Sequence, residues 1–92
     1  MTDVEFLKAM PKVELHVHIE GALKPDDYFD LAEKTAVELP VSGREAWRDF
    51  YKFTDFDHFI QVYTTSAGIL RSAADYKFIV ERFFALQASQ NI

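Results

Sequence analysis

Two histidines separated by one residue are the feature of this sequence with the clearest chemical potential. His16 and His18 lie in residues 13–19, where apolar and polar side chains alternate strictly. Alternation of this kind predicts a β-strand, in which residues two apart point to the same side with Cα atoms roughly 6.5–7 Å apart. Two imidazoles at that spacing can bind one first-row metal ion, such as zinc, iron or nickel.

The same pattern also fits a site without metal. One face of a half-exposed sheet is commonly polar, and His16 and His18 would then only be hydrated. Two imidazoles do not complete a metal site, so further ligands must come from elsewhere. The third histidine, His58, is predicted to lie on the surface of a helix, and the sequence has no cysteine, which excludes a thiolate ligand.

Five helices are predicted around this strand. A capping pair precedes two of them: Ser42 with Glu45, and Ser72 with Asp75. After Thr54, apolar residues recur at helical spacing. The predicted helices are residues 3–10, 25–36 and 43–51, one whose stripe comprises Phe56, Phe59, Ile60, Tyr63, Ala67 and Leu70, and one that starts after Ser72.

A single strand leaves its backbone N–H and C=O groups without partners, although such groups must be paired when buried. The strand therefore pairs with another chain, or the sequence is one piece of a larger fold. The 92 residues allow at most one domain. The net charge of -5 argues against nucleic acid or an anionic membrane as partner. Without an apolar signal segment, a cytoplasmic location is expected.

Residues 11–25, PKVELHVHIEGALKP, closely resemble the N-terminal signature of the adenosine/adenine deaminase family of metal-dependent amidohydrolases. Members of that family are (β/α)8 TIM barrels. The resemblance implies an α/β fold class, in which residues 1–92 are an N-terminal fragment of one barrel domain. This fragment would hold the first strand and the following helices, and would itself be mostly helical.

The resemblance also implies a site. His16 and His18 correspond to metal ligands, with zinc as the usual metal and iron or another first-row metal as alternatives. Glu20 corresponds to an acidic residue that binds the ribose in adenosine deaminases, and Gly21 is expected to allow a sharp turn. No catalytic acid or base lies in the segment, since these are expected beyond Ile92. The implied substrate-binding residues are His18, Glu20, Gly21, Phe56, Phe59, Ile60 and Tyr63.

The implied reaction is hydrolytic deamination of adenosine or adenine, with release of ammonia. The expected ligand is a small purine, and the expected protein partner is the rest of the barrel or another copy of the chain. The fragment alone is expected to be inactive. Two other functions remain open: a metal-dependent amidohydrolase with a different substrate, and a helical binding module without chemistry. Plain core packing is equally open for the stripe from Phe56 to Tyr63.

Overall fold

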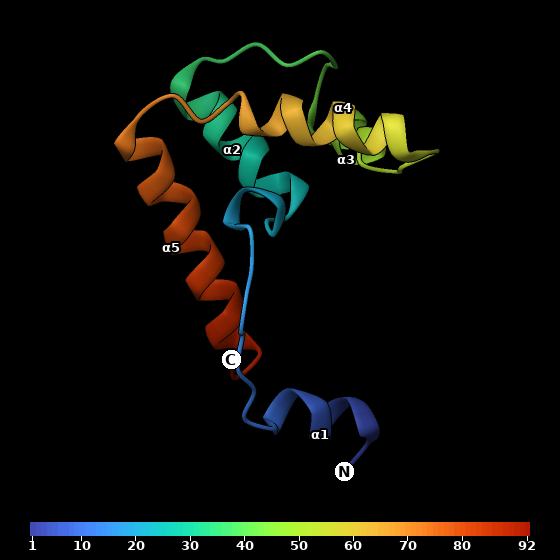
Figure 1. The fold of residues 1–92 in the computed structure, drawn as a ribbon, viewed down its shortest axis with the longest axis vertical. Coiled ribbons are helices and arrows are strands. Elements are labelled where there is room, and N and C mark those ends of the chain that lie inside the picture. Colours follow the sequence, from blue (N-terminus) through green and yellow to red (C-terminus); the bar gives the residue numbers. More distant parts are fainter.

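The computed structural model describes residues 1–92, and all its regular elements are helices (Figure 1). The five predicted helices are confirmed to within a residue or two at their ends where the prediction gave bounds. The elements are α1 (Asp3–Ala9), the 3₁₀ turn η1 (Ile19–Gly21), α2 (Pro25–Thr35), α3 (Arg44–Phe50), α4 (Phe56–Ala67) and α5 (Ala73–Ser89).

Side-chain caps explain where several of these helices start. The Ser72 hydroxyl accepts a hydrogen bond from the backbone N–H of Asp75 at 3.2 Å, as predicted. The predicted pair of Ser42 and Glu45 does not cap α3. Gly43 stands at the N-cap position of α3 with a φ of 90°, and no side chain caps this end. A capping pattern in the sequence therefore identified the helix but misplaced its first residue.

The predicted strand at residues 13–19 is wrong as a strand. The chain is extended through residues 11–18, but residues 13–17 make no backbone hydrogen bond, and η1 begins at Ile19. The physical reason is that a strand needs a neighbouring extended segment to pair with, and no other segment of this chain makes backbone hydrogen bonds to residues 13–17. The chain accordingly contains no sheet and no barrel, although its mostly helical character was predicted correctly.

The core forms where α2 packs against α3 and α5. Trp47 of α3 is fully buried, and its indole N–H donates to the Pro25 carbonyl at 2.8 Å, which joins α3 to the first residue of α2. A buried indole is normally hydrogen-bonded in this way. The residues of this core cluster are Tyr28, Leu31, Ala32, Trp47, Ile69 and Ile79.

Ion pairs reinforce the same contacts from the outside. Three carboxylates of α2 face guanidinium groups of α3 and α5, so charge as well as apolar packing fixes the relative positions of these helices. The closest contacts are Arg48 to Asp26 at 2.6 Å, Arg44 to Asp30 at 2.7 Å, and Arg82 to both Asp27 and Asp30 at 3.1 Å.

The face of α4 that turns to the core is not its aromatic stripe. Val62 and Ser66 are the buried residues of α4, and the Ser66 hydroxyl shares a hydrogen bond with Tyr51. Phe56, by contrast, is 73% exposed. Phe59 and Ile60 are also exposed, so this part of the stripe lies outside the core and is available to line a surface site, whereas Leu70 packs against the core.

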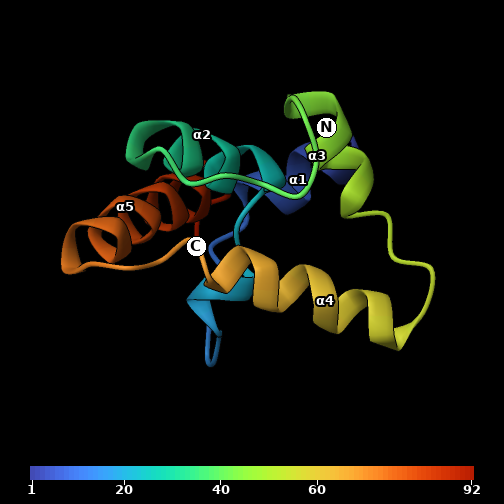
Figure 2. The same cartoon turned by 90° about the horizontal axis from the view of Figure 1, so that it is seen from above.

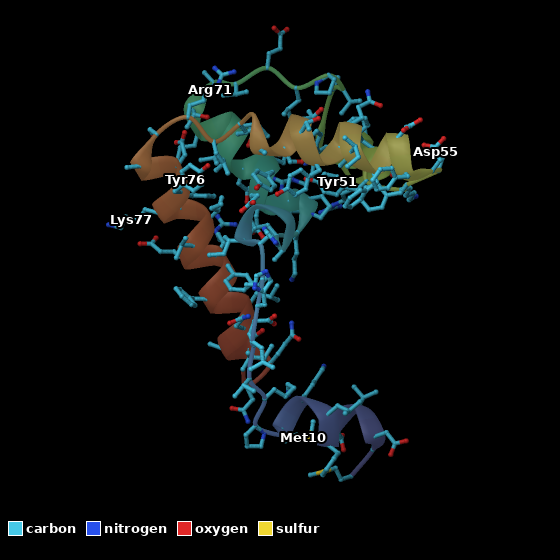
Figure 3. The ribbon with its side chains drawn as sticks, viewed as in Figure 1. Met10, Tyr51, Asp55, Arg71, Tyr76 and Lys77 are labelled. Atoms are coloured by element: carbon cyan, nitrogen blue, oxygen red, sulfur yellow. The ribbon has the colours of Figure 1, made fainter.

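The extended segment lies beside α5 and runs in the opposite direction to it (Figures 1 and 2). At its start, the Lys12 N–H donates to the Asn91 carbonyl at 3.0 Å, and at its end η1 contacts both α4 and α5. In Figure 3, Met10 at the end of α1 lies apart from Tyr51 and Tyr76, which belong to the main helical body. None of the helices has the length and apolar character that crossing a membrane requires.

Candidate functional site

The two imidazoles predicted to bind metal lie side by side. The Nε2 atoms of His16 and His18 are 3.4 Å apart, and the ring planes meet at 70°. Two nitrogens bound to one tetrahedral zinc at about 2.0–2.1 Å would be separated by about 3.3 Å. The pair therefore has the spacing of a two-nitrogen metal chelate, and this spacing arises from an extended backbone without any sheet.

No third ligand joins the pair within this chain, since no three His, Cys, Asp or Glu side chains are arranged so that they could hold a metal ion. Glu20 approaches His18 from its other side, with Oε1 at 3.9 Å from Nδ1. His58 is engaged elsewhere, because its Nδ1 accepts from the Thr54 N–H at 3.2 Å and its ring lies against Phe50. A complete metal site would need ligands from outside residues 1–92.

Glu20 is held at two points by two tyrosines. The Tyr63 hydroxyl donates to Oε1 of the Glu20 carboxylate at 2.7 Å, and the Tyr28 hydroxyl donates to the Glu20 backbone carbonyl at 2.6 Å. The bond from Tyr63 is the main cause that lowers the pKa of Glu20 below its ordinary value, and it raises the pKa of the Tyr63 hydroxyl. Glu20 is therefore an ionised hydrogen-bond acceptor beside the imidazoles.

An open groove of about 450 Å³ lies between the end of the extended segment and α4. One wall carries an imidazole and the other the exposed apolar stripe of α4, so the groove pairs a polar side with an apolar one. Its lining residues are Val17, His18, Gly21, Ala22, Phe59, Ile60 and Tyr63.

The structure thus brings five of the seven predicted substrate-binding residues together in this groove, and the other two lie at its margin. Glu20 is bonded to Tyr63 and lines a smaller cavity next to it. Phe56 does not line the groove, but its ring stacks on that of Phe59 with centroids 6.2 Å apart. These roles in substrate binding remain predictions.

Gly21 has a different role in the fold from the one expected. Its φ is not positive, so the turn at η1 does not need the special backbone freedom of glycine. A Cβ atom at this position would instead lie 3.1 Å from Cε2 of Tyr63. The missing side chain therefore lets the Tyr63 ring approach the backbone next to Glu20.

Sequence reasoning missed the part that Tyr28 plays at the site. Tyr28 is buried in the core, and burial raises the pKa of its hydroxyl. A buried tyrosine hydroxyl needs a hydrogen-bond partner, which was the available signal that it would contact a nearby polar group. The sequence did not indicate that this partner would be the Glu20 carbonyl.

Comparison with known proteins gives the family of the chain. The family model described as "Adenosine deaminase" matches residues 11–92. The chain is 39% identical over 90 residues to a protein named "Adenine deaminase" from Rhodospirillum rubrum. The matched residues cover 98% of this chain and 27% of that protein. Proteins of the same name from Caulobacter vibrioides and Pseudomonas putida are also 39% identical, over 87% and 96% of this chain. They are matched over 23% and 28% of their own lengths. The chain therefore spans about a quarter of the length of these curated relatives.

Proposed function

This chain belongs to the adenosine deaminase family, and from that premise we propose that it is the N-terminal part of an adenine deaminase. The proposal specifies adenine, where the sequence alone left adenosine and adenine open, because the relatives reported above carry the name adenine deaminase. The single observation that carries the chemistry is the pair of imidazole nitrogens of His16 and His18, which lie 3.4 Å apart, with His18 lining the groove.

In this proposal His16 and His18 are two of the ligands of one divalent metal ion, with zinc as the first candidate. The spacing of the two Nε2 atoms and the exposure of both rings fit such an ion. A metal bound here would supply Lewis acidity and lower the pKa of water toward neutrality. The remaining ligands, the general acid and the general base belong to parts of the protein outside residues 1–92.

The other residues of the groove bind and orient the purine. Phe59 and Ile60 offer an exposed apolar surface on which a flat ring can pack, which removes water from one side of the ligand. Ionised Glu20 accepts a hydrogen bond from an N–H group of the ring system. Free adenine carries such an N–H on its five-membered ring, so this acceptor fits the free base.

The test is ammonia release by the natural protein that carries this sequence, purified with its bound metal and supplied with adenine, adenosine or another 6-substituted purine. We expect adenine to be the preferred substrate. Removal of the metal by a chelator, and the substitutions His16→Ala and His18→Ala, should each lower kcat by at least about a hundredfold, since they remove the metal or its ligands. His58→Ala is the matched control, and it should keep the wild-type rate.

Two results would contradict the proposal. One is hydrolysis of a non-purine amide with no deamination of any purine. The other is full deaminase activity, with full metal content, in both the His16→Ala and His18→Ala proteins. The 92-residue chain by itself should release no ammonia, because it supplies only two metal ligands and no general acid.

A further inference from the structure

We propose that Tyr63 is a positioning residue, whose hydroxyl fixes the Glu20 carboxylate so that the site selects ligands with an N–H or O–H donor. This inference rests on the proposed function, and it gives Tyr63 a role other than packing against the purine. The Tyr63 hydroxyl is 2.7 Å from Oε1 of Glu20. Oε2 of Glu20 has no hydrogen-bond partner in the chain, so this oxygen remains for a ligand.

The bond joins two parts of the fold that are far apart in sequence. Tyr63 lies on α4, 43 residues after Glu20 on η1. The Glu20 carbonyl is fixed separately by the Tyr28 hydroxyl of α2. With its backbone held by one helix and its carboxylate by another, Glu20 has little freedom to turn toward or away from a ligand. This is how a supporting group keeps a binding residue in a defined geometry.

Contacts on the ring of Tyr63 support the same role. The ring packs over Gly21, where an added Cβ would be 3.1 Å from Cε2 and 3.6 Å from Cδ2. The ring also lines the groove, together with His18 and Ile60. Its hydroxyl is occupied by Glu20, so Tyr63 presents its ring to the groove while its polar atom acts on the carboxylate.

A carboxylate fixed in this way selects among ligands. Oε1 of Glu20 already accepts from Tyr63 and Oε2 is free to accept, so Glu20 favours a ligand group that donates a hydrogen bond. A ligand without a donor at that point leaves the second oxygen unpaired once water is displaced, which weakens binding. The Tyr63 hydroxyl therefore acts on ligand choice through Glu20, without a contact of its own to the donor.

The experiment is a double-mutant cycle in the natural protein with its metal, made of wild type, Tyr63→Phe, Glu20→Gln and the double variant. We expect Tyr63→Phe to raise KM for adenine about tenfold and change kcat by less than about twofold, with unchanged metal content. In the Glu20→Gln background the same change should have no further effect, because its action passes through the carboxylate. Tyr76→Phe is the control. Tyr76 is an exposed tyrosine of α5 whose hydroxyl has no hydrogen-bond partner. Removal of this hydroxyl should leave KM for adenine unchanged.

Unchanged KM in Tyr63→Phe, or equal effects of Tyr63→Phe with and without Glu20→Gln, would overturn the inference. A lower metal content in Tyr63→Phe would also overturn it, since the hydroxyl would then act on the metal site. If the wild-type protein deaminates no purine, the proposed function fails, and the same four proteins are compared by calorimetric binding of adenine. A coupled loss of affinity then still supports the role of Tyr63, and independent losses or no binding to wild type refute it.

Discussion

At the residue scale, the two histidines are placed by local backbone geometry, whereas Glu20 is placed by contacts between residues far apart in the sequence. His16 and His18 come together because one residue separates them on an extended backbone, which places both rings on the same side. Glu20 obtains its orientation from Tyr28 and Tyr63, which come from two different helices. The imidazole pair should therefore survive local changes elsewhere, whereas the orientation of Glu20 depends on the packing of α4.

Gly21→Ala tests that dependence. The new methyl group would meet the Tyr63 ring at 3.1 Å, so the ring must move by a few tenths of an ångström and its bond to Glu20 must lengthen. We expect the melting temperature to fall by about 4 °C, as measured by circular dichroism. In a Tyr63→Ala background the methyl group has free space, so Gly21→Ala should lower the melting temperature only slightly there. An equal loss in both backgrounds would mean that the ring does not limit position 21.

The residues of the site could be predicted to different degrees. The imidazole pair followed from local alternation alone, and it did not require the strand to be correct. The bond from Tyr63 to Glu20 could not be predicted from spacing, because it spans 43 residues. Its geometry depends on where α4 crosses η1, which is a property of the tertiary structure.

At the scale of elements, helices were predictable because their signals are local. Caps, helical spacing of apolar residues and the proline that opens α2 all act within a few residues. The prediction of a strand failed because backbone pairing between strands is not local. Residues 13–17 have the correct alternation but no segment to pair with. The stripe of α4 identified the helix but not its buried face, since the core contacts come from Val62 and Ser66.

The C-terminal end of α2 offers a test of helix capping. Ala36 adopts a left-handed conformation, with φ 57° and ψ 36°, that suits glycine better than alanine. Ala36→Gly should therefore raise the free energy of unfolding by about 0.5–1 kcal/mol in urea titrations. Ala85→Gly is the matched control within α5, and it should lower stability by a similar amount. Destabilisation by both substitutions would contradict the capping geometry.

The ion pairs of α2 predict a dependence of stability on pH. Hydrogen bonds from Arg48 and Arg44 are the main causes that hold the pKa values of Asp26 and Asp30 below their ordinary value of 3.8. A carboxylate with a lowered folded pKa stabilises the fold above its unfolded pKa and loses that effect as pH falls through the folded value. The melting temperature should therefore decline as pH is lowered from about 4, with a smaller decline in Asp30→Asn. Identical profiles for both proteins would refute the contribution of Asp30.

At the scale of the whole molecule, apolar groups that are normally buried remain exposed. Leu15 is 92% exposed and Val13 is 82% exposed, on an extended segment whose backbone groups from residue 13 to residue 17 are unpaired. Extended segments with free backbone groups and exposed apolar side chains readily pair with another chain. In the TIM barrel that the resemblance to the family implies, a neighbouring strand would cover this segment.

We therefore expect the 92-residue chain to self-associate when it is purified alone. Analytical ultracentrifugation should give a mass above the 10.7 kDa of one chain. Leu15→Lys should restore the monomer by placing a charge among the exposed apolar side chains. Glu14→Lys changes the adjacent position on the opposite face of the segment and serves as the control, which should still associate. A monomeric wild-type chain would show that the exposed segment does not mediate association.

The central claim is that His16 and His18 form one half of a metal site, and a zinc titration of the 92-residue chain followed by NMR of its imidazole groups tests it most directly. We predict that the signals of His16 and His18 shift together and that those of His58 do not. His16→Ala and His18→Ala should each abolish this shared response, and His58→Ala should preserve it. An equal response of all three histidines, or zinc binding that survives the loss of His16 or His18, would contradict the account.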